Sequence, residues 1–145
     1  MFQFVSSLNK KILKIEFSYD FTLIGIIAPI KDYRLCWFLN NELHFNLEKT
    51  DDIIHSNAEN NEIYFSRYTY FIDEGEIEYY LLTNRGSEGY LIPEHKEIDF
   101  FLMIHNLSYK SDIDQLLSRI LNINIIQTAL LLNANKLKSK ENLLF

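Results

Sequence analysis

The residues best equipped for chemistry lie in one short segment that runs Ile92-Pro93-Glu94-His95-Lys96-Glu97-Ile98-Asp99-Phe100. Its Glu-x-Lys pattern at Glu94 matches half of a metal-dependent nuclease signature, in which carboxylates hold Mg²⁺ and a lysine steadies the transition-state charge. That signature also needs an upstream aspartate on a neighbouring strand, and the one at hand, Asp73, falls in a predicted hairpin turn. We favour a structural role, in which Glu94 accepts backbone N–H groups freed at Pro93 and Asp99 anchors a neighbouring loop.

A second polar cluster occupies the segment from Asp32 to Asn40. Arg34, Trp37 and Asn40 there are candidates for a binding pocket. The competing interpretation is structural, because aromatic residues at helical spacing usually belong to a core. In that case Arg34 pairs with Asp32 or Asp99, and Asn40 satisfies carbonyl groups at a strand end. Both interpretations stay open at this point.

Motifs for other chemistries are missing. The four histidines are His44, His55, His95 and His105. No two of them are spaced so that both imidazoles could bind one metal ion. Four glycines are too few for a phosphate cradle, and there is no Gly-x-Ser-x-Gly elbow or Gly-x-Gly-x-x-Gly loop. The single cysteine, Cys36, allows no internal disulfide and suits a reducing compartment. We therefore expect no catalytic residue, no metal and no cofactor.

Composition predicts one globular domain over residues 1–145, since 48% of the residues are hydrophobic and 14% are aromatic. Lys and Arg number 14 against 20 Asp and Glu, so the net charge is −6, which disfavours nucleic-acid binding. An RNA-associated role would require two groups of lysines on one face, namely Lys10, Lys11, Lys14, Lys136, Lys138 and Lys140.

The N-terminal segment lacks the pattern of a secretory signal, because no basic stretch precedes a long apolar run. The longest apolar run, from Leu23 to Ile30, is interrupted by Gly25 and Pro29 and is far below the ~20 residues of a membrane span. We expect a cytoplasmic protein with no membrane association.

Hydrophobic periodicity predicts mostly strands. Strands are expected at 11–17, 21–28, 63–72, 76–83, 90–92 and 97–104, and the second of these is apolar on both faces like a central strand. Asp32 is the expected N-cap of a helix over 33–43, and a capping-box pattern at Ser111 predicts a second helix to about Leu121. Residues 125–132 are read as a strand, with a helix as the alternative, and 56–62 as a surface loop.

These elements indicate an α+β fold, a single domain with a mainly antiparallel sheet and two or three helices packed largely on one face. A tyrosine-rich hairpin region is a candidate interface, and its phenols are Tyr64, Tyr68, Tyr70, Tyr79 and Tyr80. The C-terminal Leu143-Leu144-Phe145 is expected to dock on the domain or on a partner, because apolar side chains are costly to leave in water.

The segment Ile92 to Phe100 resembles the signature of the bacterial IPExxxVDY family, with Ile98 in place of Val and Phe100 in place of Tyr. Residues 21–25, 32–40 and 137–145 also resemble that family, so the likeness covers nearly the whole chain. The resemblance implies a bacterial, cytosolic protein without an assigned activity. It implies no catalytic residues.

The leading functional hypothesis is a non-enzymatic protein-interaction or scaffold domain that acts with a protein partner or as a homodimer. The alternative is a small-molecule or metal-dependent enzyme with a site near Glu94 and Asp99, assisted by Arg34 and Asn40. The two hypotheses differ in whether these four side chains line one open cleft.

Overall fold

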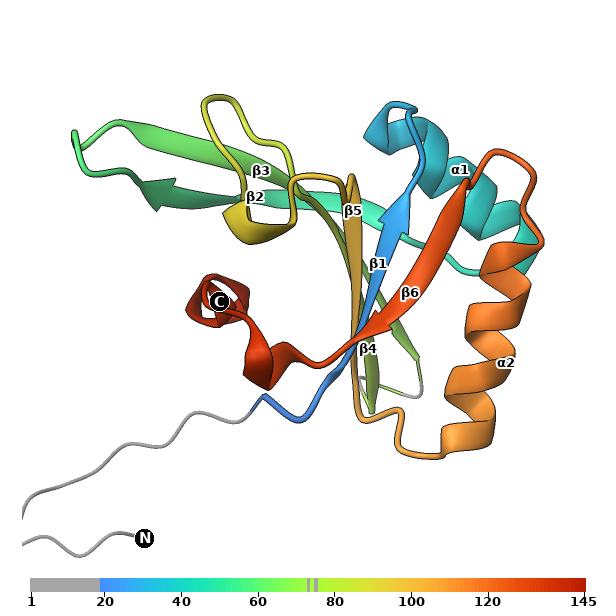
Figure 1. The fold of residues 1–145 in the computed structure, drawn as a ribbon. Helices are drawn as coiled ribbons and strands as arrows, with labels where there is room; N and C mark the ends of the chain where they lie inside the picture. The colour runs from blue at the N-terminus through green and yellow to red at the C-terminus, as the bar shows by residue number, and fades with distance from the viewer. Residues whose placement is uncertain (1–18, 73, 75) are drawn as a thin grey trace, which may run out of the picture.

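The computed structural model describes residues 19–72, 74 and 76–145. They form one six-stranded sheet whose neighbouring strands are all antiparallel, in the order β2-β3-β4-β5-β1-β6 (Figure 1). The strands are β1 (Thr22–Ile27), β2 (Glu48–Ser56), β3 (Glu62–Ile72), β4 (Ile77–Thr83), β5 (Phe100–His105) and β6 (Thr128–Leu132). The helices are α1 (Asp32–Leu43) and α2 (Lys110–Leu121), with short 3₁₀ turns at Pro93–His95, Ala134–Lys136 and Lys140–Leu143. The predicted α+β class is confirmed.

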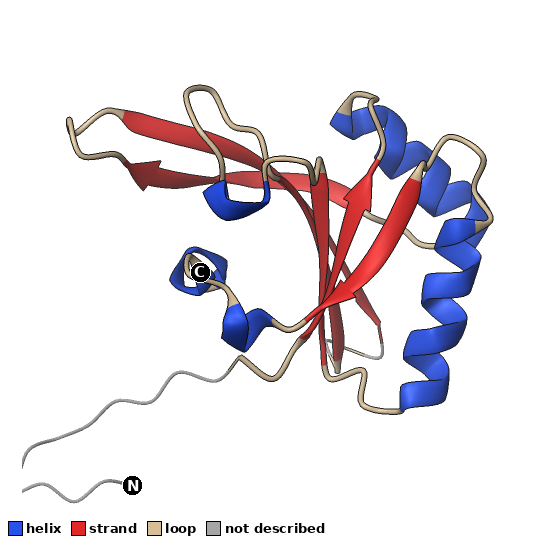
Figure 2. Cartoon of the chain, in the orientation of Figure 1, coloured by secondary structure: helices blue, strands red, loops and turns tan. Residues whose placement is uncertain are grey.

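The two α-helices cover one face of the sheet, and the C-terminal segment lies on the other side (Figure 2). Because β1 is central, its side chains alternate between two apolar clusters. Ile24 and Ile26 belong to the cluster that includes the helix residues, whereas Leu23 belongs to the cluster that includes Phe101 and Leu143 of the C-terminal segment. Leu143 is only 1% exposed, so the apolar C-terminus docks on the domain. The prediction that this strand is covered on two sides is confirmed.

Three local predictions were wrong. The segment 90–92 is no strand, since Tyr90 forms only an isolated bridge with Arg85 and a 3₁₀ turn begins at Pro93. Helix α2 begins at Lys110, ahead of the predicted capping box, and its N-cap residue Tyr109 makes no side-chain cap bond. Helix α1 likewise begins one residue early, with Lys31 as its N-cap.

Asp32 fails as a cap because its carboxylate is used elsewhere. The Tyr68 hydroxyl on β3 donates a hydrogen bond to Asp32 Oδ2 (3.1 Å). The negative charge still lies in the first turn of α1, where it is favourable next to the helix N-terminus. The predicted strand at 11–17, together with Lys10, Lys11 and Lys14, lies outside the described residues.

Strand β2 had no counterpart among the predicted elements. Its residues do not alternate, since Asp51 and Asp52 interrupt the ladder and the register with β3 shifts between Thr50 and Ile53. This irregularity lies at the edge of the sheet, where charged residues and bulges are common because they discourage pairing with other chains.

Asn84 is the buried polar residue that holds the long connection between β4 and β5 in place. Its side chain is fully buried, donates from Nδ2 to the carbonyls of His95 and Ile98 (both 2.8 Å), and accepts the Ile92 N–H at Oδ1 (2.8 Å). Its backbone bonds with Asp99 and Leu91 as well. The side chain of Asn84 thus uses both of its N–H donors and one of the two lone pairs of its oxygen to bind the backbone of this loop.

Replacing Asn84 with Ala should lower the free energy of unfolding by about 3–5 kcal/mol, because three buried backbone groups lose their partner at once. Asn40→Ala is the matched control: at a partly buried site its amide bonds to the N–H and carbonyl of Leu47 and donates to Cys36 Sγ (3.7 Å), and its loss should cost about 1–2 kcal/mol. Urea denaturation followed by circular dichroism measures both values. Equal losses in the two variants would contradict the role assigned to Asn84.

Candidate functional site

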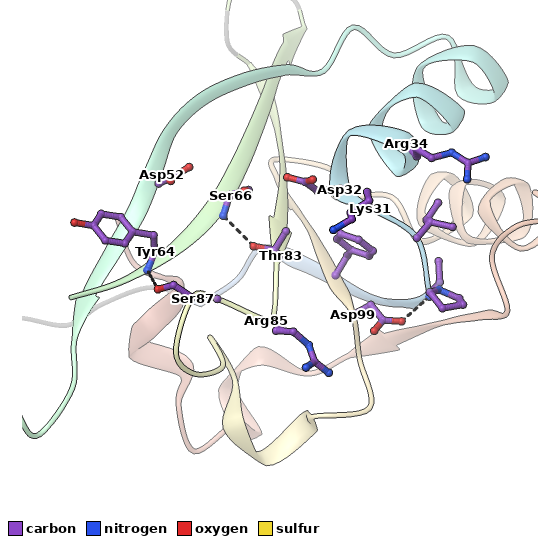
Figure 3. Close-up of a pocket in the computed structure, with 15 residues that line it drawn as sticks. Lys31, Asp32, Arg34, Asp52, Tyr64, Ser66, Thr83, Arg85, Ser87 and Asp99 are labelled. Carbon is purple, nitrogen blue, oxygen red and sulfur yellow. Dashed lines mark hydrogen bonds between the residues drawn. The ribbon is translucent and has the colours of Figure 1, made fainter. Parts of the chain in front are cut away.

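The described part of the chain contains an open cleft of about 770 Å³, drawn in Figure 3. It lies between the β1–α1 connection, the β2–β3 hairpin and the ends of β4 and β5 that adjoin the loop held by Asn84. Its ionisable side chains of both signs are Lys31, Asp32, Arg34, Asp52, Arg85 and Asp99. Three cations and three carboxylates balance one another, so the cleft carries no net formal charge.

Asp99 is the half-buried carboxylate of this cleft. Its Oδ2 accepts a hydrogen bond from the Ala28 backbone N–H (2.8 Å), and its own backbone N–H donates to Ile26 (3.0 Å). Burial raises the pKa of Asp99, although the bond from Ala28 and the charge of Arg85 oppose the rise. The carboxylate therefore fastens the β1–α1 connection to the start of β5, as the structural interpretation of the sequence had it.

The uncharged polar groups of the cleft are also engaged in the fold. The Ser66 backbone N–H donates to Thr83 Oγ1 (2.9 Å), and the Tyr64 backbone N–H donates to Ser87 Oγ (3.3 Å). Both bonds are drawn in Figure 3, where the guanidinium group of Arg34 extends away from the other labelled side chains. The cleft can bind a polar ligand, but the hydroxyl groups of Thr83 and Ser87 are committed to holding backbone.

The five candidate site residues do not converge. Arg34 and Asp99 line the cleft, and they form no ion pair with each other among the described residues. Trp37 lies on the outer side of α1 and is 60% exposed. Asn40 binds both the N–H and the carbonyl of Leu47, just before β2.

Glu94 is separated from the cleft and fixes the C-terminal segment instead. Its two carboxylate oxygens accept the backbone N–H and the hydroxyl of Ser139 (2.8 Å each). Partial burial alone would raise the pKa of Glu94, but the hydrogen bonds from Ser139 outweigh it and the pKa is lowered. Nearby, the Asn142 amide donates to the Leu91 carbonyl (2.7 Å).

The described residues were also compared with the requirements of a metal site, a reactive thiol and a membrane-spanning helix. No three side chains among the described His, Cys, Asp and Glu residues are grouped so that they could hold a metal ion. Cys36 is buried, and this burial raises the pKa of its thiol, which disfavours the reactive thiolate. Across residues 19–145, apart from 73 and 75, no helix has the length and apolarity needed to cross a bilayer.

Comparisons with protein-family models, with curated proteins and with solved structures found no match for this chain.

Sequence reasoning missed three charged residues of the cleft, Lys31, Asp52 and Arg85. Arg85 follows Asn84 in what the sequence shows only as a polar turn, and Asp52 lies on the unpredicted strand β2. No sequence pattern marks Arg85, because the burial of Asn84 that orders this loop is visible only in the structure.

Asp99→Asn should keep the hydrogen bond from Ala28, because an amide oxygen also accepts. At pH 7 the free energy of unfolding of this variant should be equal to that of the wild type or higher. The raised pKa means that ionisation is disfavoured in the folded state, so the wild type regains this stability as pH falls. The advantage of the variant should therefore shrink toward pH 4 in urea denaturation. Asp99→Ala removes the acceptor and should cost about 1–3 kcal/mol.

Glu94→Gln should show the opposite pH trend. The pKa of Glu94 is lower in the folded than in the unfolded state. The ionised carboxylate therefore stabilises the fold at pH values above the unfolded-state pKa, and this stabilisation is lost as the pH falls through the folded-state pKa. The variant should be less stable than the wild type at pH 7, by less than about 1 kcal/mol since solvent screens the site, and equal to it near pH 3. The same urea series measures this, and parallel pH trends for the two variants would contradict the assignments.

Proposed function

We propose that this chain is a non-enzymatic, cytoplasmic protein-interaction domain of the IPExxxVDY type. The roles of the residues in the signature-like segment support the proposal. Ile92 and Ile98 are buried, Glu94 binds the C-terminal segment, and Asp99 binds the β1–α1 connection. The polar groups of this segment thus stabilise the fold, so the part of the molecule that acts on other molecules is sought on its surface.

The observation that carries the proposal is a group of exposed aromatic side chains on α1. Tyr33 and Trp37 are 62% and 60% exposed, and their spacing of four residues places them on the same side of the helix. Phe38 packs edge-on against Trp37 (5.1 Å between ring centroids), and the Arg34 guanidinium lies 5.8 Å from the Phe38 ring centre. We call these four residues the aromatic face of α1.

The composition of the aromatic face fits a protein contact. Trp, Tyr and Arg are the residues that most often dominate the binding energy of interfaces. Two large rings fixed on one rigid helix lose little conformational freedom on binding, so most of their burial contributes to affinity. The partner that suits this ridge is a folded protein with an apolar groove that accepts anchors one helical turn apart.

A small-molecule or metal-dependent enzyme is the second candidate, and one observation favours it. The cleft volume of about 770 Å³ lies within the usual range for ligand pockets, and Asp99 within it has a raised pKa. The hydrogen bond from Ala28 accounts for this carboxylate structurally. Of the residues first grouped around it, Glu94 and Asn40 bind backbone elsewhere. The interaction function is therefore preferred.

The double variant Tyr33→Ala with Trp37→Ala should lose partners that the wild type retains, by at least roughly tenfold in recovered amount, because each anchor is worth about 2 kcal/mol or more. The measurement is quantitative mass spectrometry after affinity purification of the full chain from its own cells.

Tyr109→Ala is the matched control, since Tyr109 is 73% exposed but stands outside the aromatic face. This variant should recover the same partners as the wild type. Unchanged recovery in the double variant, or no specific partner for the wild type, would contradict the proposal. Circular dichroism spectra that match the wild type exclude misfolding as the cause of a loss.

A further inference from the structure

The sheet ends in an edge strand, β6, that is apolar on both sides. Among the described residues it pairs with β1 alone, and its sequence is Thr-Ala-Leu-Leu-Leu. Leu130 and Leu131 point to opposite faces and are 38% and 49% exposed. An uncovered apolar edge is a template for pairing with another strand, which natural proteins usually block.

The backbone of β6 offers hydrogen-bonding groups on its outer side. In β1 the Ile26 carbonyl accepts from Asp99 next to β5, while the Ile27 carbonyl accepts from Gln127 next to β6. Successive residues of a strand direct their backbone N–H and C=O groups to opposite sides. Ile27, Gly25 and Leu23 therefore direct theirs toward β6. Their partners in the register, Thr128, Leu130 and Leu132, direct theirs toward β1. Ala129 and Leu131 therefore direct theirs outward, where no described residue bonds to them.

Charge distinguishes this edge from the opposite one. Residues 120–135 contain no Asp, Glu, Lys or Arg, although the whole chain carries a net charge of −6. The other edge strand, β2, carries Glu48, Lys49, Asp51 and Asp52 and an irregular register. Two copies of an acidic chain repel one another over most of their surfaces, and β6 is where this repulsion is least.

We infer that β6 pairs with β6 of a second copy of this chain in antiparallel register, with the twofold axis at Leu130. This register places Ala129 opposite Leu131 of the second copy, and these are the residues whose backbone groups point outward. It also places a small side chain opposite a large one on the helix-covered face. Leu130 then meets its own copy on the other face. The contact is isologous and closed, so it produces dimers rather than fibres.

The dimer should be reversible. A single five-residue strand pair buries much less than the ~1,600 Å² of a standard interface. Dissociation in the micromolar range, on the order of 10 µM, is the corresponding expectation. This surface differs from the aromatic face of α1, so the dimer stands or falls independently of the proposed function.

The test is sedimentation velocity of the full chain over a concentration series around that value. The wild type should shift from monomer to dimer. Leu130→Lys places an ammonium group opposite its own copy and should weaken association at least roughly tenfold, because like charges directly opposite destabilise a strand pair. Leu130→Glu alone should behave in the same way. A mixture of the two variants should restore the dimer, which an effect on folding alone would not do.

Ile54→Lys is the control, since Ile54 is 51% exposed on β2 at the other edge and should leave association unchanged. Hydrogen exchange should show the Ala129 and Leu131 amides protected only at concentrations where the dimer forms. A monomer at all concentrations would overturn the inference. So would a dimer insensitive to Leu130→Lys, or protection of both amides in the monomer, which would assign the edge to another segment of the same chain.

Discussion

The fold depends on the amide of Asn84. The chain leaves the sheet after β4 and returns at β5, two adjacent strands, yet the connection between them is too long for a tight hairpin. Such a loop has many backbone groups to satisfy, and its apolar residues Leu91 and Ile92 must still reach the core. One buried asparagine meets both needs, because its side chain binds the loop at Ile92, His95 and Ile98.

The consequences of this constraint extend to the rest of the molecule. With the loop fixed, Asp99 enters β5 in position to bind Ala28, which orients the start of α1, and Glu94 faces Ser139 and retains the C-terminal segment. The polar side chains that first suggested chemistry are thus connections between segments far apart in sequence. The opposite pKa directions of Asp99 and Glu94 reflect their surroundings: burial dominates at the first, and hydrogen bonds from Ser139 dominate at the second.

Sequence patterns predicted the elements whose environment is simple. β1 is buried on both faces and α2 on one, so their periodicity follows directly from burial. β2 was not predictable in this way, because Ile53 is its one buried residue and Asp51 and Asp52 interrupt any alternation. The α1 cap failed for a different reason, since Asp32 is recruited by Tyr68 from a distant strand. Likewise, Asn84 reads as an ordinary turn residue until its loop is seen to fold back over it.

The two edge strands of the sheet, β2 and β6, differ in whether their side chains discourage pairing with another strand. At β2, charged side chains and a register shift raise the cost of pairing with any strand, so that edge can remain open to water. At β6 neither device is present, and the alternation of a small and a large residue around Leu130 makes the strand complementary to itself. In the inferred dimer this contrast makes self-association specific. Charge repulsion disfavours contact between two acidic copies at other surfaces, and the uncharged β6 edges pair in one register. The C-terminal segment packs on one face of the sheet and the helices on the other, so within the described residues the β6 edge is open to extend the sheet.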